Sequence, residues 1–191
     1  MKAPKGYLLV KGDRYDEMFE NSKLYRYFQP GRETHDINYR AQVLAVPDAA
    51  GDGIAAEVLP GDTVYFHYNT FLNNDHNYSL EDDAWRVPYF DILAAVRDGV
   101  IIPIGGWCFV EPGVERREFL AWSEEVRSET WGVLRHLGTP KEGFVMNPQA
   151  GVGDVVLFEK ADAWVNRIEG VEYYCMQQDR IAAVVVSKRA S

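Results

Sequence analysis

The sequence predicts an all-β protein built from two tandem small β-barrels, with irregular loops and at most short helices. Aromatic residues make up 13% of the chain, and 16 glycines and 9 prolines are spread along it. This composition favours strands and turns. Short apolar runs alternate with turn signals, as in small barrels, and no alternation of helices with strands is evident. The third observation is that the chain repeats itself.

The repeat has two phrases. Residues 61–66 and 153–158 each begin with Gly-Asp and continue as an apolar run that ends in Phe. After a polar stretch, residues 90–96 and 178–184 form a second pair of similar phrases, each with an Asp followed by an apolar run. A repeat of this length indicates two similar domains rather than two units of a solenoid. We therefore predict one domain over residues 1–98 and a second over residues 99–191.

In the first domain, a strand is expected over residues 6–11, followed by a long loop over residues 13–39 that carries the turn signal Pro30-Gly31. Because Pro88 has no N–H, the strand that contains it should lie at a sheet edge or a bulge. The expected strands that complete this domain are 40–46, 63–68, 85–89 and 90–96.

The second domain is expected to open at residues 100–112. Residues 112–130 are charged with sparse apolar positions, so we expect a loop whose spacing suits a short helix. The remaining strands are expected at 131–137, 155–158, 171–176 and 181–186.

Charge and cysteine content limit the possible partners. The formal net charge of −9 argues against binding to nucleic acid or to anionic membranes, since both require a basic surface. The longest apolar runs are far too short to span a bilayer. Cys108 and Cys175 lie in apolar runs, as small core residues do, and the N-terminus lacks the apolar stretch of a signal peptide. A cytoplasmic protein without disulfides is expected.

The sequence predicts no enzyme, and therefore no catalytic residue, metal ligand or cofactor. The four histidines are dispersed, and none of the usual hydrolase, metalloprotease or phosphate-binding motifs occurs. Asp62 and Asp154 are interpreted as turn residues that accept hydrogen bonds from backbone N–H groups. The glycine before each of them can take a positive φ.

The order of phrases in each half resembles the GroES-type co-chaperonin family. That family opens with Pro and a strand, continues with a long mobile loop and a Gly-Asp strand, and closes with an Asp-Ile-Leu-Ala strand. The resemblance covers nearly the whole chain in two tandem copies. It is carried in the first half by Pro4 and residues 8–11, 42–46, 60–66 and 91–96, and in the second half by Pro103 and residues 108–111, 131–134, 152–158 and 178–184.

The resemblance implies a co-chaperonin-like lid or adaptor that forms a homo-oligomeric ring and caps a chaperonin chamber to assist protein folding. In the family, a hydrophobic tripeptide of the mobile loop docks on the chaperonin. The matching segments here are 13–39 and 112–130, and neither contains the Gly-Gly-Ile-Val-Leu type of sequence. The apolar residues that this role would use are Leu24, Tyr25, Tyr27, Phe28, Phe119, Leu120 and Trp122.

Two alternatives remain open. The aromatic residues of these loops could instead cover their own barrel or a neighbouring subunit. The chain could also be a virus-encoded, structural or assembly protein that keeps the GroES-like fold without binding a chaperonin.

Overall fold

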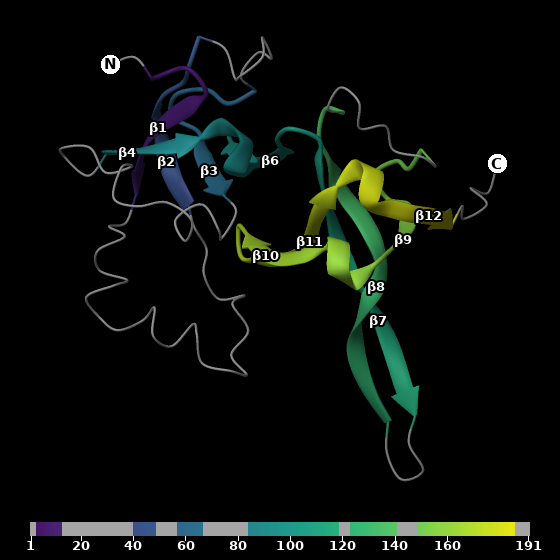
Figure 1. Cartoon of the computed structure of the whole chain (residues 1–191). Helices are drawn as coiled ribbons and strands as arrows, with labels where there is room; N and C mark the ends of the chain where they lie inside the picture. Colours follow the sequence, from purple (N-terminus) through teal and green to yellow (C-terminus); the bar gives the residue numbers. More distant parts are fainter. Residues whose placement is uncertain are drawn as a thin grey trace. The chain divides into compact units, whose positions relative to one another are not determined.

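The computed structural model describes residues 3–12, 40–48, 57–66, 84–118, 123–140 and 149–185. The chain divides into two compact units, Met1–Ile104 and Gly105–Ser191. Both are built from antiparallel strands (Figure 1), and the helices among the described residues are single turns of 3-10 helix. The prediction of an all-β chain with at most short helices is confirmed.

The first unit contains a six-stranded sheet with the order β4-β1-β2-β3-β5-β6. A 3-10 turn, η3 (Tyr89–Asp91), separates β4 from β5. The strand that ends in Pro88 lies at the edge of the sheet, as its missing N–H requires. The strands are β1 (Tyr7–Gly12), β2 (Arg40–Ala45), β3 (Thr63–Phe66), β4 (Ala84–Pro88), β5 (Ile92–Arg97) and β6 (Val100–Pro103).

The second unit also contains a six-stranded sheet, with the order β10-β11-β7-β8-β9-β12. Two 3-10 turns, η4 (Lys160–Asp162) and η5 (Gln178–Arg180), precede β10 and β12. The strands are β7 (Trp107–Glu118), β8 (Ser123–Leu137), β9 (Val155–Phe158), β10 (Trp164–Ile168), β11 (Val171–Gln177) and β12 (Ile181–Val185).

The two sheets share a five-stranded arrangement that makes the sequence repeat a structural one. The order β4-β1-β2-β3-β5 in the first unit corresponds to β11-β7-β8-β9-β12 in the second. The turns correspond as well: the N–H of Tyr89 donates to Gly6 O at 2.9 Å, and the N–H of Gln178 donates to Gly106 O at 3.1 Å. The units therefore share a common β module, to which the first adds β6 and the second adds β10.

One apolar cluster fills each module, because alternate residues of a strand point to the same face. The burial of β2 alternates strictly along its six residues. In the first unit, the core cluster includes Leu8, Val10, Val43, Val64 and Ile92. In the second unit, it includes Cys108, Val110, Leu134, Val156 and Ile181.

Several expectations differ from the structure. Residues 100–103 form β6, which pairs with β5 in the first unit, because Asp98-Gly99 makes a tight hairpin turn with positive φ at both residues. The expected helix within 112–130 is wrong, since residues up to 118 and from 123 belong to paired strands. The predicted closure into barrels is not seen: within the described residues, each unit contains an open six-stranded antiparallel sheet.

The second phrase of the repeat also aligns differently from the sequence comparison. Ile92 pairs with Phe66 and Ile181 pairs with Phe158. Ile92 and Ile181 are therefore equivalent, and the alignment of Asp91 with Asp179 is one residue out of register.

Candidate partner-binding site

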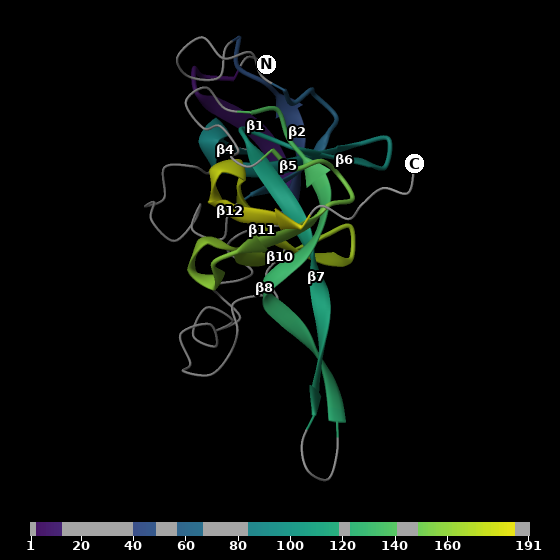
Figure 2. The same cartoon turned by 90° about the vertical axis from the view of Figure 1, so that its right-hand side faces the viewer.

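The most unusual feature of the second unit is a long two-stranded ribbon formed by the distal parts of β7 and β8. We define the ribbon as Val114–Glu118 and Ser123–Arg127, which pair continuously from Val114 with Arg127 to Glu118 with Ser123. β11 pairs with β7 only as far as Val110, and β9 pairs with β8 only from Trp131 to Val133. The ribbon thus continues beyond its neighbouring strands, and both views show it projecting from the sheet (Figures 1 and 2).

Three of the four residues that connect the two strands of the ribbon, Phe119, Leu120 and Trp122, are apolar residues singled out in the sequence. Phe119, Leu120, Ala121 and Trp122 join Glu118 to Ser123. They lie outside the described residues, so their contacts stay a prediction. The same holds for the other four predicted contact residues, Leu24, Tyr25, Tyr27 and Phe28, which fall within residues 13–39.

The ribbon itself is charged on both faces. Arg116 pairs with Glu125 across the strands, and Arg117 pairs with Glu124. Opposite charges at facing positions stabilise an antiparallel pair. The only apolar residues of the ribbon are Val114, which is exposed, and Val126. The ribbon is therefore solvated, and its two strands are joined by four residues, three of which are large and apolar.

At the base of the ribbon, the strand pairing is interrupted. Pro112 pairs with Gly132 and the next pair is Val114 with Arg127, so a single residue of β7, Gly113, faces four residues of β8. Such bulges bend a strand pair and increase its twist. Ser128, within the interruption, is buried, and its hydroxyl accepts a hydrogen bond from the Thr130 N–H at 3.4 Å.

Trp131 closes this interruption. A Cβ built on Gly113 would lie 2.3–2.4 Å from three atoms of the Trp131 ring, so the ring lies flush against the glycine. The indole Nε1–H donates to Glu115 Oε1 at 3.1 Å. Trp131 therefore contacts the start of the ribbon while its own backbone pairs with Leu157 in the sheet.

Position 132 requires a glycine, because the backbone of Glu111 on the neighbouring strand lies too close for a Cβ. A Cβ at this position would lie 2.2 Å from Glu111 O and 2.7 Å from Val110 Cγ1. We expect Gly132→Ala to lower the free energy of unfolding of the second unit by about 1–3 kcal/mol, the usual cost of overpacking. Urea unfolding followed by tryptophan fluorescence measures this, since four of the five tryptophans lie in this unit. Gly151→Ala is the control, because its Cβ would meet only Asp154 Oδ2 at 3.6 Å; equal losses in both variants would contradict the prediction.

Ion pairs connect the ribbon and its base to elements on both sides of it. Arg127 Nη1 contacts Glu172 Oε1 on β11, and Arg167 on β10 lies 3.5 Å from the same carboxylate. Burial raises the pKa of Glu172, but the hydrogen bonds and charges of the two arginines outweigh it and hold the pKa below its usual value. Lys160 of η4 pairs with Glu129 of β8, and both side chains are largely exposed.

The Gly-Asp turns are structural, as their sequence predicts. The Asp62 carboxylate accepts the Leu59 N–H at 2.8 Å, and the Asp154 carboxylate accepts the Gly151 N–H at 2.8 Å. Gly61 and Gly153 have φ values of 94° and 96°, a region that favours glycine. Both turns therefore use the same geometry.

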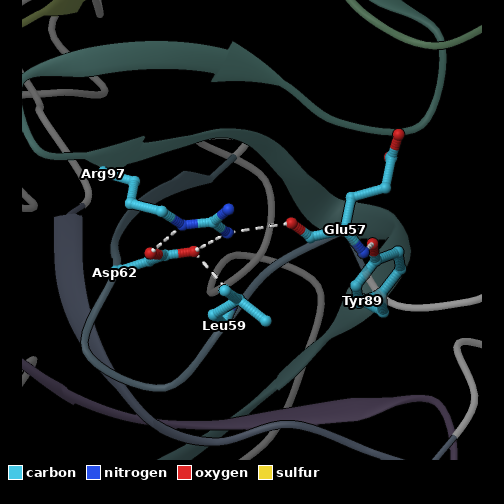
Figure 3. A network of polar contacts seen from close by, with 5 residues as sticks. All are labelled: Glu57, Leu59, Asp62, Tyr89 and Arg97. Carbon is cyan, nitrogen blue, oxygen red and sulfur yellow. Dashed lines mark hydrogen bonds and ion pairs between the residues drawn. The ribbon is translucent and has the colours of Figure 1, made fainter.

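The first unit adds an ion pair that the second turn does not show among the described residues. Arg97 Nε and Nη2 donate to the two carboxylate oxygens of Asp62 at 2.9 and 2.7 Å, and Nη2 also donates to Glu57 O at 3.2 Å (Figure 3). The Tyr89 hydroxyl accepts the Glu57 N–H at 2.7 Å. Burial raises the pKa of Asp62, but Arg97 and the Leu59 N–H reverse that effect and leave the pKa below its usual value. The network joins β5 to the Gly-Asp turn.

A second polar cluster surrounds His136 on β8. Its Nε2 lies 3.4 Å from the Tyr173 hydroxyl, and its ring packs edge-on against the rings of Tyr173 and Phe109. Burial, followed by the charge of Arg135, lowers the pKa of His136. The neighbouring Arg135 is paired with Glu111, whose charge also acts on Tyr173. The cluster is therefore a partly buried aromatic and polar contact between β7, β8 and β11.

This environment makes the stability of the second unit dependent on pH. A histidine whose folded pKa lies below its unfolded value of about 6.5 binds protons more readily in the unfolded state, so stability should fall as the pH drops from about 7.5 to 5.5. We expect His136→Gln to flatten this part of the profile, measured by urea unfolding across the range. Parallel profiles for the natural protein and the variant would contradict the assignment.

Sequence reasoning found the apolar connecting residues but missed the ribbon and its supports. The sequence does contain a signal for the ribbon: Arg116 and Arg117 are matched by Glu125 and Glu124 on the other strand. This match is recognisable only when the two segments are aligned as a hairpin. Trp131 was placed in a strand without a role. Nothing in the sequence links Arg97 to Asp62, because the pair spans 35 positions.

No family model matches the chain, and no curated protein matches its sequence. In the part of the chain that the structure describes, no group of three or more His, Cys, Asp or Glu side chains could hold a metal ion. None of the helices described there is long and apolar enough to cross a membrane.

Proposed function

We propose that this chain is a co-chaperonin-like lid or adaptor that forms a ring, caps a chaperonin chamber in the cytoplasm and assists protein folding without catalysing a reaction. The observation that carries the proposal is the projecting, charged ribbon, whose two strands are connected by a segment that includes Phe119, Leu120 and Trp122. These three large apolar residues follow directly, in the chain, on two paired strands that extend beyond the rest of their sheet. Aromatic side chains of this size supply most of the energy at many interfaces.

The shared β module is the second support. Two copies of one strand order, each with the same Gly-Asp turn, are what a tandem GroES-like chain requires. Completion of each module into a small barrel is part of this proposal. In the first unit, the ribbon's counterpart in chain order is the segment 13–39, which carries Leu24, Tyr25, Tyr27 and Phe28.

Ring formation through sheet edges is consistent with the topology. β6 and β12 each lie at the end of a sheet. β6 is apolar throughout, and Val100 is 60% exposed. Exposed apolar edge strands can pair with an edge strand of another chain and so join two sheets. We propose a homo-oligomeric ring joined in this way.

Mixing the protein with a chaperonin and ATP tests the function. We expect the two proteins to co-elute on gel filtration and the rate of ATP hydrolysis by the chaperonin to fall. Bovine serum albumin at the same concentration is the control for non-specific effects. Absence of co-elution with every chaperonin tried, including one from the cell in which the protein is made, would contradict the proposal and favour a structural or assembly role for the same fold.

A further inference from the structure

The backbone pairing by itself leaves the direction of the ribbon weakly fixed. Beyond Gly113, the ribbon is two strands wide, and a lone antiparallel pair is only marginally stable in water. The pairing between ribbon and sheet is broken where Gly113 faces residues 128–131. A two-stranded arm attached through such a bulge would bend easily unless side chains held it.

Trp131 is the side chain that spans the break. Its backbone belongs to the sheet, where it pairs with Leu157, while its ring packs on Gly113 and its Nε1–H reaches Glu115. Gly113 and Glu115 lie two residues apart, so they face the same side of β7. One rigid aromatic ring, whose backbone belongs to the sheet, therefore contacts β7 at two points, Gly113 at the break and Glu115 in the ribbon.

The Arg127–Glu172 ion pair supplies a second connection. Arg127 is the ribbon residue that pairs with Val114, and Glu172 lies on β11, on the far side of β7 in the strand order. Glu172 is only 25% exposed, and Arg167 lies 3.5 Å from it on the opposite hairpin strand. Together with Trp131, this pair holds both strands of the ribbon at its base.

We propose that Trp131 and Glu172 are positioning residues that hold the ribbon as an arm of fixed direction, so that its connecting residues reach their partner already oriented. The role in partner binding rests on the proposed function, whereas the fixed direction does not. A pre-oriented arm loses less conformational entropy on binding than a flexible one, so its affinity is higher for the same contacts.

Distances between two spin labels in the full chain test the fixed direction. Ser123→Cys places one label at the end of the ribbon, and Thr139→Cys places the other just after β8; both positions are exposed. The natural cysteines stay unlabelled, because Cys108 and Cys175 are fully buried and burial raises the pKa of both thiols. We expect a narrow distribution of the distance between the two labels when no other residue is changed.

Three variants and one control test whether these side chains hold the ribbon. Trp131→Ala and Glu172→Gln should each broaden the distribution, and Trp131→Phe should restore much of it because the ring still covers Gly113. Arg180→Gln, which breaks an ion pair with Asp162 elsewhere in the unit, is the matched control and should leave it unchanged. A broad distribution in the natural sequence, or the same narrow one in both Trp131→Ala and Glu172→Gln, would overturn the proposal.

Affinity for the chaperonin provides the second readout. Trp131→Ala should weaken binding by about tenfold, through the entropy of an arm that must then be ordered on binding. Unchanged affinity in a variant with a broadened distance distribution would overturn the role in binding. If no variant and not even the natural protein binds a chaperonin, the proposed function fails, while the spin-label distances still decide whether the arm is held.

Discussion

Arg97→Met is expected to lower the free energy of unfolding of the first unit by about 3 kcal/mol, the lower end of the range for a buried ion pair that loses one partner. The Asp62 side chain is 3% exposed, and without Arg97 its carboxylate would keep only the Leu59 N–H. The lower end applies because the Arg97 side chain is 33% exposed, so water can replace part of its contact. Hydrogen exchange measured by mass spectrometry on β3 and β5 follows this unit specifically.

Two further variants make this prediction specific. Asp62→Asn in the Arg97→Met background should recover part of the loss, because a neutral amide costs less to bury than a carboxylate. Asp154→Asn is the matched control in the second unit, since Asp154 makes the same turn hydrogen bond and should lose only about 1 kcal/mol. Equal losses for Arg97→Met and Asp154→Asn would show that the ion pair contributes nothing beyond the turn.

The pH dependence has a defined sign. The pKa of Asp62 is lower in the folded protein than in the unfolded chain, so the ion pair contributes fully above the unfolded value of about 3.9 and is lost as the pH falls further. The deficit of Arg97→Met should therefore be largest near neutral pH and shrink on acidification. A deficit that grows as the pH falls would contradict this account of the pair.

Replacing both Phe119 and Leu120 with serine is expected to weaken chaperonin binding by more than about 30-fold, because loss of a central apolar contact typically costs at least 2 kcal/mol. The fold should be unaffected, since the charged pairs of the ribbon stay in place. Val114→Ser, the control, removes an exposed apolar residue of the ribbon itself and should bind normally. Titration of the chaperonin's ATP hydrolysis with each variant gives the affinities.

The corresponding double replacement in the first unit, Leu24→Ser with Tyr25→Ser, decides whether one or both segments contact the partner. Loss of binding in only one double variant would assign the contact to that segment. Unchanged affinity in both double variants would rule out the assignment of the chaperonin contact to these two segments, even if the protein still binds a chaperonin.

Local patterns in the sequence predicted the common β module well. The Gly-Asp turns hold where they were expected, because a positive φ and a side chain that bonds a nearby N–H are properties of adjacent residues. Pro88 likewise marks its own strand as an edge. The positions of β1 and β7 at the start of each module also follow from short apolar runs.

What the sequence could not predict depends on contacts between distant positions. The charged segments on either side of residues 119–122 read as a loop, because the partner that makes each of them a strand is the other segment. β10 was missed for a similar reason, since its residues become a strand by pairing with β11. The packing of the Trp131 ring on Gly113 and the ion pair between Arg97 and Asp62 are tertiary contacts that no local sequence pattern indicates.

Electron images of the chaperonin mixed with this protein and nucleotide test the central claim most directly. We predict extra density closing one or both ends of the chaperonin cylinder, with slender arms from the cap touching the rim of the chamber. The same images taken with the Phe119→Ser, Leu120→Ser variant should show open cylinders if the ribbon carries the contact. Cylinders that stay open with the natural protein at saturating concentration would contradict the claim that this chain is a chaperonin lid.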